Sequence, residues 1–327
     1  MMTFYKYHGA GNDFLIADNR DGKLSLRTSD SAADGTGTKL EVADIQHLCD
    51  RHTGFGADGL MLLQSSSEHA FRMEFFNPDG SGGMMCGNGG RCIVAFAADL
   101  GMIPESQPIT FEAPDGIHEA VVTANTGLTK TVRLSMKDVS GIRVWPEERS
   151  CFLDTGTRHL VKFVKNLSDY PVAEEGSRLR HDPRFAPIGT NVNFVGPELL
   201  PDGNTVLYVR TFEKGVEAET LACGTGIVAA ALAACHQGYP CQPTDDDHYK
   251  YTIKAAIADL TVEFSANGCN ENFQASHIRL TGPATFVGTV LLSTSILPLW
   301  EEAASARAIL QANPSHAAAT PHGVPSA

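Results

Sequence analysis

Two cysteines stand at equivalent places in two similar stretches of this 327-residue chain. The first stretch is Cys86-Gly87-Asn88-Gly89, and the second is Cys223-Gly224-Thr225-Gly226. Each opens an apolar run that ends at a glycine, Gly101 or Gly238, where a helix would need a left-handed C-terminal residue. The pattern predicts two helices, each with a thiol at its N-terminus.

The N-terminus of a helix is suited to anions, because it carries unpaired backbone N–H groups and a partial positive charge. Glycines let a ligand approach the backbone closely, and the positive end favours thiolate over thiol. One such site is compatible with a nucleophile, an anion site or no function. Two predict a pair of thiols acting on one small anionic ligand. A phosphate-binding loop is the weaker interpretation, because no Gly-Lys-Ser/Thr follows either cysteine.

The composition is that of a globular protein long enough for two domains, with 43% hydrophobic residues. A net charge of −13 argues against nucleic acid and against an anionic membrane surface as partners. No apolar stretch reaches the roughly 18 residues that a spanning helix needs. The first residues contain no signal-peptide core, so we expect a cytoplasmic location.

Eight cysteines occur, without a Cys-x-x-Cys pair, and Cys86 and Cys92 are poorly spaced for zinc. We therefore expect reduced thiols and no bound metal. A redox-sensing protein with a Cys86–Cys223 disulfide is the alternative from another functional class.

The elements that must position the thiols are mostly strands. A polar insertion covers residues 20–41, and a helix is expected over 42–51. Alternating apolar residues predict strands over 4–6, 15–17, 60–63, 71–76, 109–113, 119–123, 131–136, 206–212, 251–257, 260–264, 278–281 and 284–292. A domain boundary is expected near 138–150. Residues 298–327 are expected to form a surface helix and a disordered tail.

Five motifs together resemble the diaminopimelate epimerases. They are His8–Phe14, Asn77–Ser81, Cys86–Cys92, Gly189–Phe194 and Ala222–Gly226. The resemblance implies an α+β fold of two pseudo-symmetric domains, each a β-sheet or barrel wrapped around a central apolar helix, with the active site between them. The first domain would be residues 1–140, completed by the strand 284–292, and the second would be 141–283.

The resemblance also implies the reaction, an isomerase interconverting L,L- and meso-diaminopimelate without a cofactor, towards lysine and peptidoglycan. Epimerisation needs one deprotonated and one protonated group on opposite faces of the α-carbon, and Cys86 and Cys223 would be this pair. His159 and Glu213 would support their protonation. The remaining candidates would bind the amino-acid substrate: Asn12, Asn77, Gly87, Asn88, Thr157, Asn191, Glu213, Lys214, Gly224 and Thr225.

Two departures from the family's usual sequence bear on the substrate. Thr157-Arg158-His159 stands where Asn-Pro-His is usual, and Glu213-Lys214 stands where Glu-Arg is usual. Lysine cannot reproduce the two parallel hydrogen bonds of an arginine to a carboxylate. A racemase of another amino acid, such as histidine, with the same two-cysteine mechanism is therefore the alternative. The oligomeric state stays open, a homodimer included.

Overall fold

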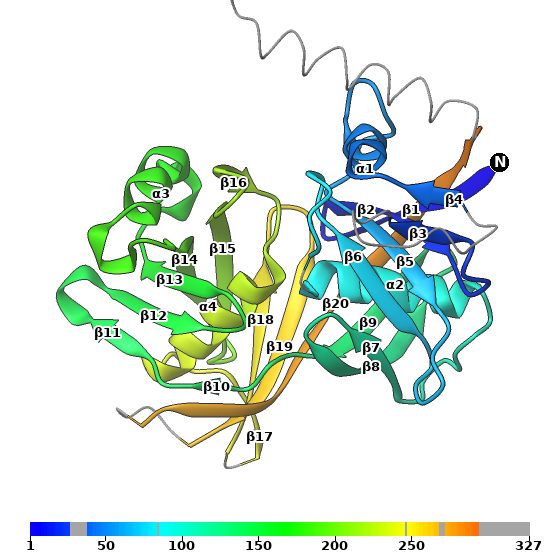
Figure 1. The fold of residues 1–327 in the computed structure, drawn as a ribbon. Helices are drawn as coiled ribbons and strands as arrows, with labels where there is room; N and C mark the ends of the chain where they lie inside the picture. Colours follow the sequence, from blue (N-terminus) through cyan, green and yellow to red (C-terminus); the bar gives the residue numbers. More distant parts are fainter. Residues whose placement is uncertain (27–37, 84, 246, 268–271, 294–327) are drawn as a thin grey trace, which may run out of the picture.

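The computed structural model describes residues 1–26, 38–83, 85–245, 247–267 and 272–293. The fold is α+β. Its two longest described helices, α2 (Gly87–Asp99) and α4 (Gly224–His236), lie in the two halves of the molecule, and strands surround each (Figure 1). Apart from the small β3–β4 pair, the named strands form one continuous 18-stranded sheet.

Helix α2 is the centre of the first half. It packs against β1, β2, β5, β8, β9 and β20, and Ile93, Val94 and Phe96 on it are buried. The elements of this half are β1 (Met2–Gly9), β2 (Asn12–Asp18), β3 (Leu24–Leu26), β4 (Thr38–Leu40), α1 (Val42–Cys49), β5 (Leu60–Gln64), β6 (Arg72–Phe76), β7 (Ile109–Ala113), β8 (Gly116–Asn125) and β9 (Thr129–Ser135).

Helix α4 is the centre of the second half. It is rich in alanine, and its small side chains let the strands on all sides approach closely, so that residues from Gly226 to Cys235 are buried. The other elements are β10 (Val139–Ser140), β11 (Arg143–Trp145), β12 (Ser150–Asp154), β13 (Arg158–Phe163), α3 (Val172–Arg180), β14 (Asn191–Leu199), β15 (Thr205–Glu213), β16 (Ala218–Thr220), β17 (Gln242–Asp245), β18 (His248–Lys254) and β19 (Asp259–Ala266), with short 3-10 turns between some of them.

The two halves share the last strand, β20 (Gln274–Leu292). Its first part pairs with β19 and β10, and from Gly282 onward it pairs with β9 and β1. The sequence predicted two separate strands here, over 278–281 and 284–292. The structure keeps Gly282-Pro283 extended, since Pro283 lies opposite Thr131 of β9 and Gly282 leaves room for the side chain of Arg91.

The end of β18 and the segment over residues 20–41 also differ from the sequence expectations. The strand expected over 251–257 ends at Lys254, and Ala255 N–H donates to Ala258 O in a turn. The polar composition of residues 20–41 predicts an exposed insertion, but the described strands β3 and β4 within it pair in parallel and Leu40 is buried. Residues 27–37, and the helix and tail expected over 298–327, lie outside the described residues.

Candidate active site

The two cysteines are the N-cap residues of the two central helices. The Sγ of Cys86 accepts a hydrogen bond from Gly89 N at 3.2 Å, and the Sγ of Cys223 lies 3.5 Å from Thr225 Oγ1. The helix ends touch: a Cβ at Gly224 would lie 3.2 Å from Gly87 Cα. Both thiols are free. The sequence-predicted pair is thus brought to one place from opposite halves of the fold.

Burial controls the protonation of both thiols. It raises the pKa of Cys86 to about 11, because the loss of solvent outweighs the Gly89 N–H and the charge of Arg91. The pKa of Cys223 is also raised, first by burial and then by the charge of Glu213. The sequence led us to expect a lowered thiol pKa at a helix terminus, but desolvation is the larger effect. Both thiols are therefore protonated at neutral pH in this structure.

His159 is fully buried and approaches Cys223 through a threonine. Asn193 Nδ2 donates to His159 Nδ1 at 3.0 Å, and Asn193 Oδ1 accepts from the hydroxyl of Thr211. The other ring nitrogen, Nε2, therefore carries the proton and lies 3.0 Å from Thr225 Oγ1. Burial lowers the pKa of His159 to about 3, so the ring is neutral.

Glu213 lies at the end of β15, where its charge acts on both cysteines. Its Oε2 accepts from Thr220 Oγ1 at 3.0 Å. Burial raises the pKa of this carboxyl group, and the charge of Asp58 adds to the shift. The structure therefore places Glu213 within electrostatic reach of both thiols.

Asn12 and Asn88 meet beside Cys86. Asn88 Nδ2 donates to Asn12 Oδ1 at 3.3 Å and to Ala222 O at 3.1 Å. Asn12 Oδ1 also lies 4.0 Å from Cys86 Sγ, as an acceptor for the thiol. The Asn88 amide thereby ties the first half of the molecule to the residue that precedes Cys223.

Asn191 connects the strand ends around His159. Its Nδ2 donates to Arg158 O at 3.2 Å, and its Oδ1 accepts from Lys214 N at 2.8 Å. Thr157 Oγ1 lies 2.9 Å from His159 Nε2. Thr157, Asn191 and the backbone of Lys214 therefore lie together beside His159. The side chain of Lys214 is exposed.

Arg158 lies on the other face of β13 from His159, because successive side chains of a strand alternate. Leu160, which shares the face of Arg158, packs with Val172 and Leu179 of α3. The replacement of the family's usual proline by Arg158 therefore concerns the outer face of this strand.

Asn77 is bound within its own turn. Its Nδ2 donates to Ser81 Oγ at 3.0 Å and its N–H to Ser81 O. No hydrogen bond of the described residues joins it to the other candidates.

Four polar residues that hold the candidates in place are not among those predicted from the sequence. They are Asp58, Arg91, Asn193 and Thr211. The available signals were a charged residue inside an otherwise apolar helix, for Arg91, and a second asparagine one strand repeat after Asn191, for Asn193.

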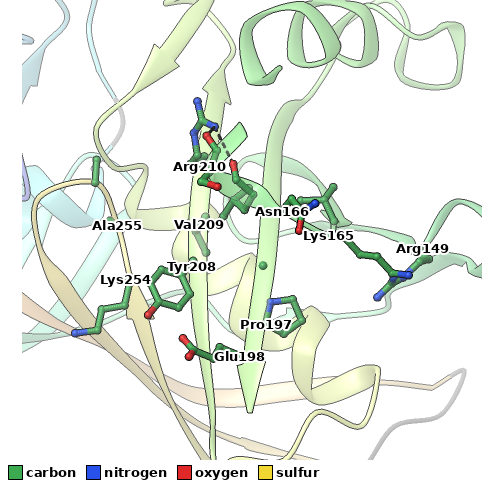
Figure 2. Close-up of a pocket in the computed structure, with 15 residues that line it drawn as sticks. Arg149, Lys165, Asn166, Pro197, Glu198, Tyr208, Val209, Arg210, Lys254 and Ala255 are labelled. Carbon is green, nitrogen blue, oxygen red and sulfur yellow. Dashed lines mark hydrogen bonds between the residues drawn. The ribbon is translucent and has the colours of Figure 1, made fainter. Parts of the chain in front are cut away.

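A cavity of about 700 Å³ lies away from the cysteines, along β14 and β15 (Figure 2). Lys165, Glu198, Tyr208 and Lys254 are among its lining residues, and none of the lining residues is a sequence-predicted candidate. No group of three His, Cys, Asp or Glu side chains suited to a metal is found among the described residues. No helix in the described part of the chain is long and apolar enough to cross a membrane.

The fold occurs in solved structures that include a phenazine biosynthesis protein and an epimerase. A Bacillus anthracis phenazine biosynthesis protein of the PhzF family superposes with a TM-score of 0.62 at 16% identity, covering 89% of this chain and 99% of that one. A hydroxyproline epimerase from Agrobacterium vitis, with bound trans-4-OH-L-proline, gives 0.59 at 18% identity, covering 88% and 91%. These likenesses establish the fold.

Sequence comparison narrows the class to one family. The diaminopimelate epimerase family model matches residues 4–139 and 151–284. The chain is 40% identical over 286 residues to a diaminopimelate epimerase of Flavobacterium psychrophilum, covering 88% of this chain and 98% of that protein. It is 43% identical over 237 residues to one of Chlorobaculum tepidum, covering 70% and 82%. The chain belongs to the diaminopimelate epimerase family.

Proposed function

We propose that this protein is a cofactor-independent isomerase that interconverts L,L- and meso-2,6-diaminopimelate in the cytoplasm, on the route to lysine and peptidoglycan precursors. The relatives at 40% and 43% identity, both diaminopimelate epimerases, support the substrate. The observation that carries the mechanism is the placement of Cys86 and Cys223 as N-caps of two helices whose ends touch.

The two thiols act as acid and base in turn. One, as thiolate, removes the α-proton from one face of the substrate, and the other, as thiol, delivers a proton to the opposite face. Their roles exchange with the direction of the reaction. Because burial raises both thiol pKa values, one of the two thiols must lose its proton to the solvent as the substrate enters, which leaves one thiolate and one thiol. The ammonium group of the substrate supplies the positive charge that stabilises the thiolate.

The carbanion places extra negative charge on the α-carboxylate. Backbone N–H groups of Gly87, Asn88, Gly224 and Thr225 lie at the two helix N-termini, where they stabilise this charge as an oxyanion hole does. The partial positive charges of the two helix ends also repel each other until an anion binds at their junction. The α-carboxylate of the substrate therefore binds at this junction.

Two supporting residues act on the thiols in different ways. His159 is neutral and acts on Cys223 through the Thr225 hydroxyl, while the carboxyl group of Glu213 lies within electrostatic reach of both cysteines. Asn12, which lies beside Cys86, binds the reacting end of the substrate. The distal part is bound by Asn77, Thr157, Asn191, Glu213 and Lys214.

Exchange of the α-proton in D₂O, followed by NMR under reducing conditions, tests this function. The substrates are both diaminopimelates and common L-amino acids, including histidine. We expect exchange with the diaminopimelates alone. Exchange with another amino acid alone would keep the chemistry and reject the substrate.

Replacing one thiol at a time tests the mechanism. Cys86→Ala and Cys223→Ala should each abolish epimerisation with the circular dichroism spectrum kept, because either change removes one of two obligatory proton carriers. Cys151→Ala, at a buried thiol outside the site, is the control and should remain active. Appreciable epimerisation by either site variant would reject the two-thiol assignment.

A further inference from the structure

A buried arginine lies beneath the N-terminus of α2. Arg91 has none of its surface exposed, and its guanidinium donates to Gly87 O at 3.0 Å, Asn88 Oδ1 at 2.8 Å and Pro283 O at 3.4 Å. Among the residues that the structure describes, no carboxylate forms an ion pair with it. Burial lowers its pKa to about 10, which leaves the charge in place at neutral pH. Its partners are all neutral oxygens, close to Cys86.

Arg91 fixes the orientation of the Asn88 amide. A guanidinium has donors only, so the atom of Asn88 that faces it must be the carbonyl oxygen. The amide nitrogen is thereby turned the other way, where it donates to Asn12 Oδ1 and to Ala222 O.

Asp58 fixes the orientation of the Asn12 amide, which is the next group in this chain of hydrogen bonds. Its Oδ2 accepts from Asn12 Nδ2 at 2.6 Å and from Asp13 N at 3.1 Å, and its Oδ1 is paired with Arg51 Nη2 at 2.7 Å. An ion-paired carboxylate accepts only, so Asn12 must turn its nitrogen towards Asp58. The oxygen of Asn12 is left facing Asn88 and the Cys86 thiol.

We propose that Arg91 and Asp58 are positioning residues that together hold the Asn88 and Asn12 amides in one orientation, so that Asn12 presents its oxygen to Cys86 and to the substrate. A group that meets this oxygen must be a donor. In naming the substrate the inference rests on the proposed function: an α-ammonium group fits beside Asn12, while the α-carboxylate lies at the helix ends.

The pH dependence of Cys86 alkylation by iodoacetamide tests the orientation without substrate. The full-length protein is labelled between pH 6.5 and 11.5, and Cys86 is quantified by peptide mass spectrometry. In Asp58→Asn the new amide can donate, so Asn12 is no longer held at this side and can turn its own N–H towards the thiolate. Asn88 Nδ2 then loses its bond to Asn12 and keeps the one to Ala222 O. We expect the midpoint to fall by about one pH unit.

A second replacement restores a hydrogen-bond acceptor opposite Cys86. In Asn12→Asp/Asp58→Asn, the amide at 58 donates to the carboxylate at 12, and an acceptor again faces Cys86. Its midpoint should return to the wild-type value or above. An unchanged midpoint in Asp58→Asn, or the same lowered midpoint in the double variant, would show that the amide orientation does not act on Cys86.

Arg91→Met tests the role of Arg91 in holding the Asn88 amide. It frees the Asn88 amide and removes a buried positive charge, so the alkylation midpoint should rise. Lys130→Met is the matched control, because Lys130 is an equally buried cation, paired with Asp99 at the far end of α2. Equal shifts in both variants would contradict a specific role for Arg91. If Arg91→Met does not fold, Arg91→Lys replaces it and should show a smaller rise, and no rise counts against the proposal.

Steady-state kinetics separate this inference from the proposed function. Asp58→Asn should raise KM for diaminopimelate about 10- to 100-fold, the usual effect of losing a hydrogen bond to a charged group, with a smaller change in kcat. Asp182→Asn, a carboxylate paired with Arg184 elsewhere, should leave KM unchanged. An active enzyme in which Asp58→Asn changes neither KM nor the midpoint would reject the inference alone. If the variants show the expected midpoint shifts but the wild-type protein shows no α-proton exchange with diaminopimelate, the proposed function alone is rejected.

Discussion

Gly224 and Gly87 lie against each other where α4 and α2 meet: a Cβ at Gly224 would stand 3.2 Å from Gly87 Cα and 3.4 Å from Asn88 N. Two positive helix ends in contact repel each other, and the arrangement becomes favourable when an anion is bound there. The contact also sets how far apart the two N-cap thiols can be. Because neither glycine has a side chain, the two helix ends can touch, and this contact sets the distance between the two thiols.

A methyl group at this contact should separate the helices. Because the atoms opposing it are backbone, we expect Gly224→Ala to destabilise the fold by about 1–3 kcal/mol and to reduce kcat/KM by about 100-fold. Urea unfolding and α-proton exchange measure the two effects. Gly288→Ala, where a Cβ would meet open space, is the control. Full activity in Gly224→Ala would mean that the spacing is not critical.

Stability should fall as the pH rises from 9 towards 11. The folded-state pKa of Cys86 is raised from 9.0 to about 11, so the unfolded chain loses this proton first as the pH rises. This deprotonation lowers the free energy of the unfolded chain relative to the fold over that interval. The contribution is fully present below pH 9. We expect the urea midpoint of Cys86→Ala to depend less on pH between 9 and 11 than that of the wild type. Parallel curves would indicate that Cys86 titrates normally in the folded protein.

Acid should destabilise the protein through His159. Burial lowers its folded-state pKa from 6.5 to about 3, so the unfolded chain takes up this proton first as the pH falls. The stabilisation is complete above pH 6.5 and is lost as the pH falls towards 3. Between pH 7 and 4, the free energy of unfolding of His159→Gln should therefore decrease less than that of the wild type. His52→Gln, at an exposed histidine, should retain the wild-type slope.

The charge at Lys214 should affect substrate affinity more than chemistry. A lysine offers one point charge, whereas an arginine can bind a carboxylate through two parallel hydrogen bonds. We expect Lys214→Arg to lower KM for diaminopimelate severalfold and Lys214→Met to raise it at least about tenfold, both with kcat nearly constant. Lys165→Met, at the cavity in Figure 2, is the control. Equal KM values in all variants would exclude a contact between the Lys214 side chain and the distal carboxylate of the substrate.

The sequence by itself determined the local elements and the chemical groups. The cysteine, the glycines and the apolar run that follows predict both the helices and their N-cap thiols, because capping and periodicity depend on near neighbours in the chain. Family motifs added the candidates around them. A continuous β20 was missed because its Gly282-Pro283 is held extended by β9, a long-range pairing that local preference does not contain.

Only the tertiary structure decided the electrostatics and the supporting residues. Burial reverses the pKa shift expected for the thiols, and burial depends on how both halves pack around them. Arg158 is turned from the site by strand alternation, while Asp58 and Arg91 reach it from distant parts of the sequence. Hydrogen bonds and desolvation act over a few ångströms in space, so residues far apart in sequence determine them.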